Sequence, residues 1–245
     1  MSFCCPTDKS VAASAGEYSP EGTSETIGAM DCYVVGSGDK IVVMIYDIFG
    51  FHPNNFELAD NIASARGWKV VIPDLLRGSA WPAVNFPPKT PAQSGAFAAF
   101  LTGPADAKKR VLDVKVLIET IRAVEPEASV AVLGFCWGCK LAALCALAIP
   151  RLKAIAGAHP AFLNEEDGRL VKLPTLWLPT GDDDMTEYQT GVLTGGNSQN
   201  VTVNENFRDM FHGFMAARGD WTNPKLREKA SAGTQVIVGF LEKYF

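Results

Sequence analysis

The stretch that decides the fold is SVAVLGFCWGCKLAALCALAIP, residues 129–150. Residues 129–133 form a short apolar run rich in β-branched side chains, which is typical of a buried strand. Residues 139–149 are rich in Ala and Leu, are apolar on nearly every face and end at Pro150, so they predict a buried helix. The turn between them, GFCWG, carries glycine on both sides of Cys136, as a sharp turn between closely packed elements requires.

A strand that feeds a tight turn into a helix is how an α/β-hydrolase presents its nucleophile, and here the central residue is Cys136. A helix N-terminus favours negative charge, so it should lower the pKa of a thiol at this position. Two other interpretations remain open at this point. Cys136 could be an inert buried thiol, or it could form a redox C-x-x-C pair with Cys139. A zinc site would need a second pair of ligands, and the stretch contains none.

Strand-like and helix-like segments alternate along the rest of the chain, which predicts an α/β fold with a mainly parallel, twisted sheet and helices on both faces. We expect one domain over residues 29–245, preceded by a loosely structured N-terminal arm, residues 1–28, rich in Ser, Thr, Glu, Gly and Pro. Residues 30–36 and 40–46 are two strand-like runs separated by Gly-Ser-Gly-Asp, a pattern typical of a hairpin.

Composition limits the possible functions. The 245 residues are 47% hydrophobic and 20% charged, enough to bury a substantial core. A formal net charge of −5 argues against a nucleic-acid partner. No apolar run is long enough to span a membrane, and the N-terminus lacks the plan of a signal peptide. Six cysteines are too sparse for a disulfide framework, so we expect a cytoplasmic protein with reduced thiols, either a monomer or a dimer.

A hydrolase of this plan needs an acid and a base after the nucleophile, in that chain order. Asp184 follows one predicted strand and His212 follows the next, so both should meet Cys136 at one edge of the sheet. Asp182 and Asp183 are rivals for the acid, and the spacing Gly181-x-x-Asp184 favours the third aspartate. His52 and His159 are expected to line the pocket or to make structural hydrogen bonds.

Two further segments should complete the site. The backbone N–H groups of Trp137 and Ile48 are the candidate oxyanion hole, since one follows the nucleophile and the other follows a central strand. Ile48 lies in DIFGF, with Asp47 and Phe49 at a strand end where ligands collect. Residues 75–91 form a long loop rich in Pro and aromatic residues that should cover the site.

Along the chain the sequence carries five characteristic strings, DIFGF, PDLLRG, GFCWGC, GDDD and FHGFMAARG. In this order they resemble the dienelactone hydrolase family, its fungal and other eukaryotic members above all. The resemblance extends from about residue 30 to the C-terminus. The resemblance implies an α/β-hydrolase fold of about eight strands without a large cap domain. It also implies a triad of Cys136, Asp184 and His212, and no metal or organic cofactor.

The same resemblance implies roles for three charged residues. Asp47 stands where the bacterial enzymes carry a glutamate that holds the resting thiol. Arg77 and Arg218 lie in loops that correspond to those of two arginines that hold the substrate carboxylate.

The expected function is hydrolysis of a small ester or lactone through an acyl-enzyme, and an apolar pocket for the acyl group is expected from Trp81, Phe86, Phe49 and Trp137. The alternative is a ligand-binding or sensor protein that kept the fold without turnover. Turnover of a short ester that is lost on substitution of Cys136 would separate the two.

Overall fold

The computed structural model describes residues 18–245, and these form one eight-stranded sheet with the order β1-β2-β4-β3-β5-β6-β7-β8. The strands are β1 (Thr23–Ile27), β2 (Met30–Val35), β3 (Lys40–Ile45), β4 (Lys69–Pro73), β5 (Ser129–Phe135), β6 (Leu152–Ala158), β7 (Thr175–Leu178) and β8 (Val201–Val203). The pairs β1–β2 and β2–β4 are antiparallel, and the pairs from β4 through β8 are parallel. The predicted mainly parallel sheet of about eight strands is confirmed.

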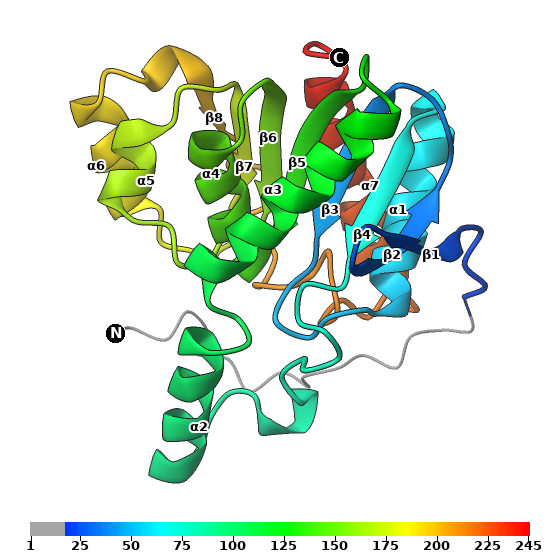
Figure 1. Ribbon diagram of the computed structural model, residues 1–245. Coiled ribbons are helices and arrows are strands. Elements are labelled where there is room, and N and C mark those ends of the chain that lie inside the picture. Colours follow the sequence, from blue (N-terminus) through cyan, green and yellow to red (C-terminus); the bar gives the residue numbers. More distant parts are fainter. Residues whose placement is uncertain (1–17) are drawn as a thin grey trace.

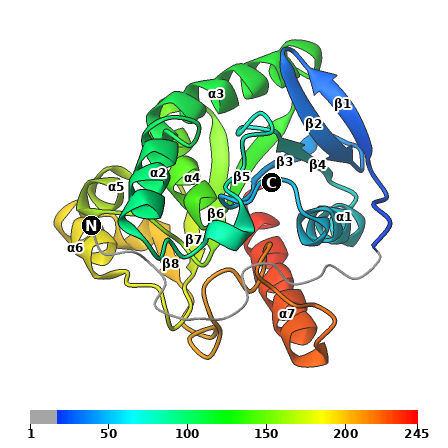
Figure 2. The same ribbon diagram turned by 90° about the horizontal axis from the view of Figure 1, so that it is seen from below.

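Helices cover both faces of the sheet (Figures 1 and 2). On one face lie α3 (Ala107–Val124) and α4 (Trp137–Ala148), and on the other lie α1 (Pro53–Arg66) and α7 (Pro224–Leu241). At the β8 end of the sheet lie α5 (Glu165–Leu170) and α6 (Thr186–Thr194). No helix in the described part of the chain is long and apolar enough to cross a membrane.

The central strands explain why the sheet needs both helical layers. Residues 41–45 of β3 are fully buried, because this strand is apolar on both faces. On β5, Ser129 at the start of the strand is half-buried and the other residues are buried. Both strands therefore run through the middle of the core, and their carboxyl ends are fixed relative to each other by parallel pairing of Ile45 with Gly134.

The predicted hairpin between residues 30–36 and 40–46 is wrong. The strands β2 and β3 are not neighbours, since β4 lies between them and pairs with both. The strand β3 is buried on both faces and takes β4 and β5 as parallel partners, so β2 is left to pair antiparallel on the outer side. The turn residues between β2 and β3 do not indicate which strand pairs next to β3.

The expectation of a loose arm over residues 1–28 is wrong from Tyr18 onward, and the earlier part of the arm lies outside the described residues. The strand β1 extends the sheet antiparallel to β2. Asp60 of α1 holds the segment before it, accepting hydrogen bonds from the Tyr18 hydroxyl at 2.6 Å and from the Glu21 N–H at 2.9 Å. The domain therefore begins earlier than the predicted boundary at residue 29.

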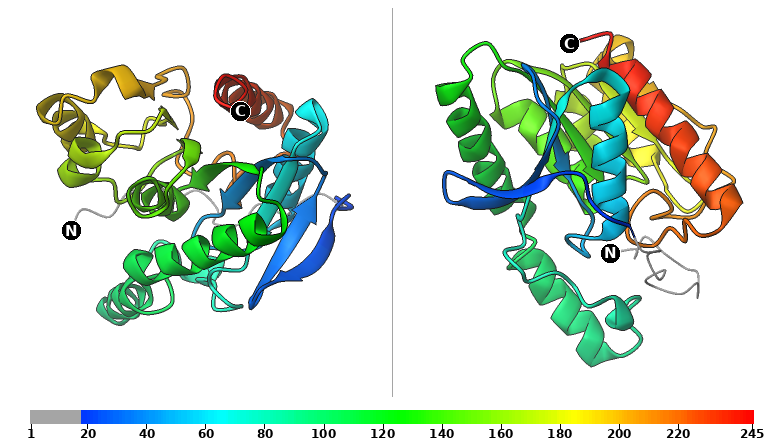
Figure 3. Two further views of the ribbon diagram at one scale, coloured as in Figure 1. Left: turned by 45° about the horizontal axis from the view of Figure 1, so that its top comes forward. Right: turned by 90° about the vertical axis from the view of Figure 1, so that its right-hand side faces the viewer.

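One segment projects from the body (Figures 1 and 3). It comprises the loop after β4, the short 3-10 helix η1 (Ala83–Asn85) and α2 (Pro91–Thr102). Thr90 caps α2 by accepting from the Gln93 N–H, and the Gln93 side chain reaches back in a capping box. A single helix of this length agrees with the expected absence of a large cap domain.

Candidate active site

Cys136 occupies a strained turn between β5 and α4. Its φ of 54° and ψ of −115° lie in a region that non-glycine residues rarely adopt. The two flanking glycines are required by close backbone contacts. A Cβ on Gly134 would lie 2.2 Å from the Gly138 carbonyl oxygen, and a Cβ on Gly138 would lie 2.4 Å from the Ile45 oxygen. The turn therefore has the geometry of a nucleophile elbow.

Hydrogen bonds to neighbouring segments hold this elbow in place. The Cys136 N–H donates to the Ala158 oxygen at 3.3 Å, and the Cys136 carbonyl accepts from the Ala161 N–H at 3.2 Å. Trp137 is the first residue of α4, so its N–H has no acceptor within the helix. The Trp137 side chain is buried, and its indole N–H donates to the Ala105 oxygen.

His212 is paired with Asp183. The imidazole Nδ1 lies 2.6 Å from the Asp183 Oδ1, and both side chains are buried. The other Asp183 oxygen accepts from the Thr180 N–H and hydroxyl, each at 2.7 Å. Burial acts to raise the pKa of Asp183, but the hydrogen bond and charge of His212 together with the Thr180 donors hold this pKa below its usual value. Asp183 is therefore an anion placed to orient the imidazole.

The prediction that Asp184 orients His212 is wrong. The Asp184 side chain is exposed and accepts from the Thr186 N–H at 2.9 Å, at the start of α6. A turn in which the Asp183 N–H donates to the Thr180 oxygen directs Asp183 inward instead. Asp182 accepts from the His212 backbone N–H at 3.0 Å, so all three aspartates have distinct partners. Spacing within GDDD could not show which carboxylate faces the core.

Cys139 lies beside the same groups but is placed as a core residue. Burial raises its pKa well above the usual value, the charges of Cys136 and Asp183 add to this effect, and His212 opposes it. Its thiol lies 3.1 Å from the Gly134 oxygen and 3.4 Å from the Ala158 oxygen. A thiol with a raised pKa is a poor partner for redox exchange, so the C-x-x-C interpretation loses support.

The turn after β3 is held from several directions. One Asp47 oxygen accepts from the Phe49 N–H at 2.9 Å and the other accepts from the Ala217 N–H at 3.2 Å. The Trp81 N–H donates to the Ile48 oxygen at 2.9 Å. Burial raises the pKa of Asp47 to about 6, against the two backbone donors and the charges of His212 and Arg218. Asp47 thus joins the loop of Ile48 to the loop of His212.

The two candidate arginines have different surroundings. Arg218 is 5% exposed, and its Nη1 donates to the His212 carbonyl oxygen at 2.6 Å. The Arg218 guanidinium carbon lies 5.7 Å from the Phe211 ring centroid and 5.9 Å from that of Phe86. The Arg77 side chain is 59% exposed and pairs with Asp113 of α3 at 3.2 Å. The structure therefore brings Arg218 to the site and places Arg77 on the α3 surface.

Aromatic side chains gather beside this edge, on the projecting segment and the turn after β3. The Phe86 ring centroid lies 5.7 Å from that of Phe49 and 5.8 Å from that of Phe97. Trp81 packs against Phe97 at 4.9 Å and against Phe100 at 5.4 Å. Phe97 and Phe100 of α2 were not among the predicted site residues. Their spacing of three residues is an ordinary helical signal and does not by itself indicate what the face contacts.

The two remaining histidines differ. His52 caps α1, with its Nδ1 accepting from the Asn54 N–H at 3.2 Å, which confirms a structural role. His159 follows β6, is fully buried and lies against His212, with ring centroids 5.1 Å apart. Among residues 18–245, no group of three or more His, Cys, Asp and Glu side chains is arranged to hold a metal ion.

Comparison with known proteins agrees with this geometry. Residues 30–244 match the model of the dienelactone hydrolase family. The chain belongs to this family. It is 32% identical to an uncharacterized AIM2 family protein of Schizosaccharomyces pombe, over 99% of both chains. It is 25% identical to the carboxymethylenebutenolidase homolog of Mus musculus, over 93% of both chains.

A solved structure supports the fold. The dienelactone hydrolase-like promiscuous phosphotriesterase P91 from metagenomic libraries superposes with a TM-score of 0.62 at 18% identity, covering 93% of this chain and 98% of that one. The protein therefore has the fold of the dienelactone hydrolases. Within this family it is a hydrolase of carboxylic ester or lactone bonds.

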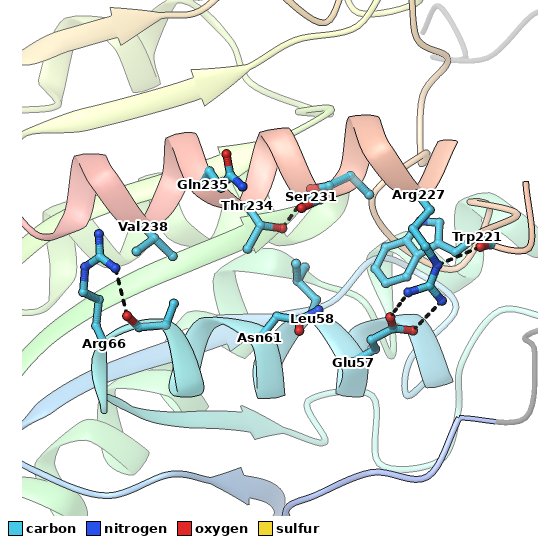
Figure 4. A pocket seen from close by; sticks show the side chains of 12 residues that line it. Glu57, Leu58, Asn61, Arg66, Trp221, Arg227, Ser231, Thr234, Gln235 and Val238 are labelled. Atoms are coloured by element: carbon cyan, nitrogen blue, oxygen red, sulfur yellow. Dashed lines mark hydrogen bonds and ion pairs between the residues drawn. The ribbon is translucent and has the colours of Figure 1, made fainter. Parts of the chain in front are cut away.

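A groove with a volume of about 470 Å³ lies between α1 and α7 (Figure 4). Arg227 and Glu57 form an ion pair at one end, with an N–O distance of 2.5 Å. Arg66 lies at the other end and pairs with Glu242 at 2.8 Å. The residues of the described chain that line this groove include neither histidine nor cysteine.

Proposed function

We propose that this dienelactone hydrolase family member cleaves a small ester or lactone through an acyl-enzyme, with Cys136 as nucleophile, His212 as base and Asp183 as the acid that orients it. The observation that carries the proposal is the buried 2.6 Å contact between His212 Nδ1 and Asp183, at the same sheet edge as the strained Cys136 elbow. A base oriented by a buried carboxylate, beside a nucleophile at a helix N-terminus, is the arrangement that acyl transfer requires.

The reaction then follows in two steps. His212 takes the proton of the Cys136 thiol, and the resulting thiolate attacks the carbonyl carbon, so that a C–S bond forms as the carbonyl oxygen becomes an oxyanion. When the C–O bond breaks, His212 gives a proton to the leaving alkoxide and a thioester remains on Cys136. Water attacks the thioester while His212 takes its proton, and cleavage of the C–S bond returns the thiolate and releases the carboxylic acid.

Two backbone N–H groups are proposed to hold the oxyanion, those of Trp137 and Ile48. Trp137 is the first residue of α4, where the helix dipole also favours negative charge. Ile48 follows β3, the parallel neighbour of β5, in a turn held by Asp47 and by the Trp81 N–H. Loss of one such donor costs on the order of 100-fold in rate.

The surroundings favour an apolar acyl group with at most one anionic substituent. The aromatic rings of Phe49, Phe86 and Trp81 supply apolar surface next to the site. Arg218 is the arginine proposed to attract a substrate carboxylate. Arg77 is proposed to tether the 75–91 loop through Asp113 instead, so we expect weaker dependence on a substrate carboxylate than two converging arginines would give.

A direct experiment compares Cys136, at the N-cap of α4, with Cys139 inside that helix. Wild-type protein should hydrolyse p-nitrophenyl acetate and carry an acetyl group on Cys136 by intact-mass and peptide analysis. C136A should lose activity by about 10⁴-fold or more, because the nucleophile is gone. C139S should keep the activity, because the Cys139 thiol is buried on two backbone carbonyls.

Equal inactivity of wild type and C136A toward short esters, lactones and thioesters would contradict the proposal and favour a binding or sensor protein. An acyl group found on another residue would contradict the role of Cys136. A panel that includes dienelactone alongside uncharged lactones would define the substrate class.

A further inference from the structure

His159 lies in the tightest part of the candidate site. It follows the last residue of β6, its N–H donates to the Leu178 oxygen of β7 at 2.8 Å, and its side chain is fully buried. Its φ of 39° is unusual for a residue with a side chain. The residues on either side of the His159-Pro160 pair, Ala158 and Ala161, make the backbone hydrogen bonds to Cys136. The position of His159 is therefore fixed relative to the elbow.

The ring of His159 packs among aromatic groups. Its centroid lies 5.1 Å from that of His212 at an interplanar angle of 66°, 5.7 Å from Phe135 and 6.1 Å from Phe214. Neither ring nitrogen of His159 has a hydrogen-bond partner among the described residues. The contact that the ring makes with His212 is therefore one of packing, and of the two expected roles, lining the pocket or making structural hydrogen bonds, the second is not supported by the described residues.

Two features of His159 oppose folding. A buried polar ring without hydrogen bonds loses the solvation it had in water, and a positive φ strains the backbone. Both occur at one residue in contact with the His212 imidazole. Buried unsatisfied groups and strained residues cluster where function requires a fixed arrangement. A purely structural core position could be filled by an aliphatic side chain without the first of these costs.

The ring of His159 also stays uncharged. Burial lowers its pKa well below the usual value, the positive charges of His212 and Arg218 lower it further, and Asp183 acts in the opposite direction. A neutral ring does not repel an imidazolium at His212 and does not compete with it for Asp183. It can therefore remain packed on His212 in both protonation states of the base.

We propose that His159 is a positioning residue whose neutral ring fixes the plane of the His212 imidazole, so that Nδ1 stays on Asp183 and Nε2 stays available to the nucleophile. The proposal rests on the proposed function of His212 as base. It assigns no proton transfer to His159, which acts through its contact with His212.

Three variants of the full-length protein test this role. H159A removes the ring and should lower kcat by about 10- to 100-fold, since a small misplacement of a reacting group has effects of that size, with KM within about twofold. H159F restores an aromatic ring and should recover most of kcat. H52A removes a histidine that caps α1 and should leave kcat unchanged.

A spectroscopic readout separates positioning from general stability. The short hydrogen bond between His212 and Asp183 should give a far-downfield proton resonance in wild type and in H52A. This resonance should broaden or disappear in H159A while the remaining spectrum stays that of a folded protein. If H159F overfills the site and does not fold, the resonance in H159A decides the question by itself.

Three outcomes would overturn the proposal. Wild-type kcat in folded H159A would show that the ring contact is dispensable. Equal loss in folded H159F and H159A would show that the ring nitrogens act chemically. An unchanged downfield resonance in H159A would show that His212 is held without the contact. The two kcat outcomes rest on the proposed function, whereas the resonance outcome does not depend on Cys136: activity in C136A would remove the proposed function and leave the resonance experiment valid.

Discussion

The carboxyl edge of the sheet and the groove between α1 and α7 both contain charged side chains, but these side chains differ in how deeply they are buried. At the edge, Asp47, Asp183 and His159 are buried, and their pKa values are shifted from the usual range. In the groove, each of the two ion pairs has an exposed arginine, and in the pair of Arg66 and Glu242 both side chains face solvent, at 42% and 51% exposed. The groove is an open pocket, yet the described residues that line it include no cysteine and no histidine.

The difference teaches that the presence of a groove is by itself a poor guide to chemistry in this protein. Placing a carboxylate or an imidazole out of water is costly, so a fold keeps such groups where they have a task. An exposed ion pair costs little and contributes little. The strained Cys136 backbone lies with the first group, at the edge, and the functional site should be there.

The largest effect should separate two adjacent aspartates. D183N leaves His212 without an anionic partner and should lower kcat by about 10³- to 10⁴-fold with little change in KM. D184N removes an exposed side chain that contacts the Thr186 N–H and should stay within about threefold of wild type in kcat. Steady-state kinetics on a short ester measures both. A reversed ranking would restore Asp184 as the acid and remove Asp183.

A smaller effect is expected at Asp47. An asparagine offers one acceptor oxygen, so either the Phe49 or the Ala217 N–H loses its partner and the Ile48 turn shifts. We expect D47N to lower kcat by about 10- to 100-fold. D209N, which alters an exposed aspartate paired with Lys229, is the matched control and should keep wild-type kcat.

The same residue gives a pH test of stability. The pKa of Asp47 is raised to about 6 in the fold, so between about pH 4 and pH 6 the native state holds a proton that the unfolded chain has released. The contribution of Asp47 to the free energy of unfolding should therefore fall as pH rises through this window, by roughly 3 kcal/mol. In D47N this part of the pH dependence should be absent from denaturant titrations. An identical pH dependence in both proteins would contradict the burial of a titrating Asp47.

The smallest effect is expected for a substitution in the groove between α1 and α7. R66A breaks the exposed pair with Glu242 and should lower the free energy of unfolding by about 0.2–1 kcal/mol, with a smaller difference at high salt. Its kcat and KM should match those of wild type. A large loss of activity in R66A would show that the groove takes part in the reaction after all.

Most of the fold could be predicted from the sequence because its signals are local. The apolar runs of β3 and β5, the Gly134 and Gly138 frame and the Pro150 stop each specify a segment of known type. The predictions that are wrong concern which strands pair with each other. The neighbours of β2 and the pairing of β1 depend on which strand competes best for a central position, and no short stretch carries that information.

The candidate site divides in the same way. Cys136 and His212 follow from chain order and strand ends, so pattern alone could place them at one edge. The choice of Asp183 over Asp184 depends on one hydrogen-bonded turn at Thr180. The separation of Arg77 from Arg218 depends on a competing partner, Asp113, that lies far away in sequence.

The sequence by itself determined the class of fold and the elbow, because these rest on periodicity, glycine and proline, which act within a few residues. The tertiary structure alone decided which aspartate faces His212, that Asp47 joins two loops, and that the His159 ring packs on His212 without a hydrogen bond to any described residue. Burial and hydrogen bonding between distant segments set those choices, and both are properties of the packed chain.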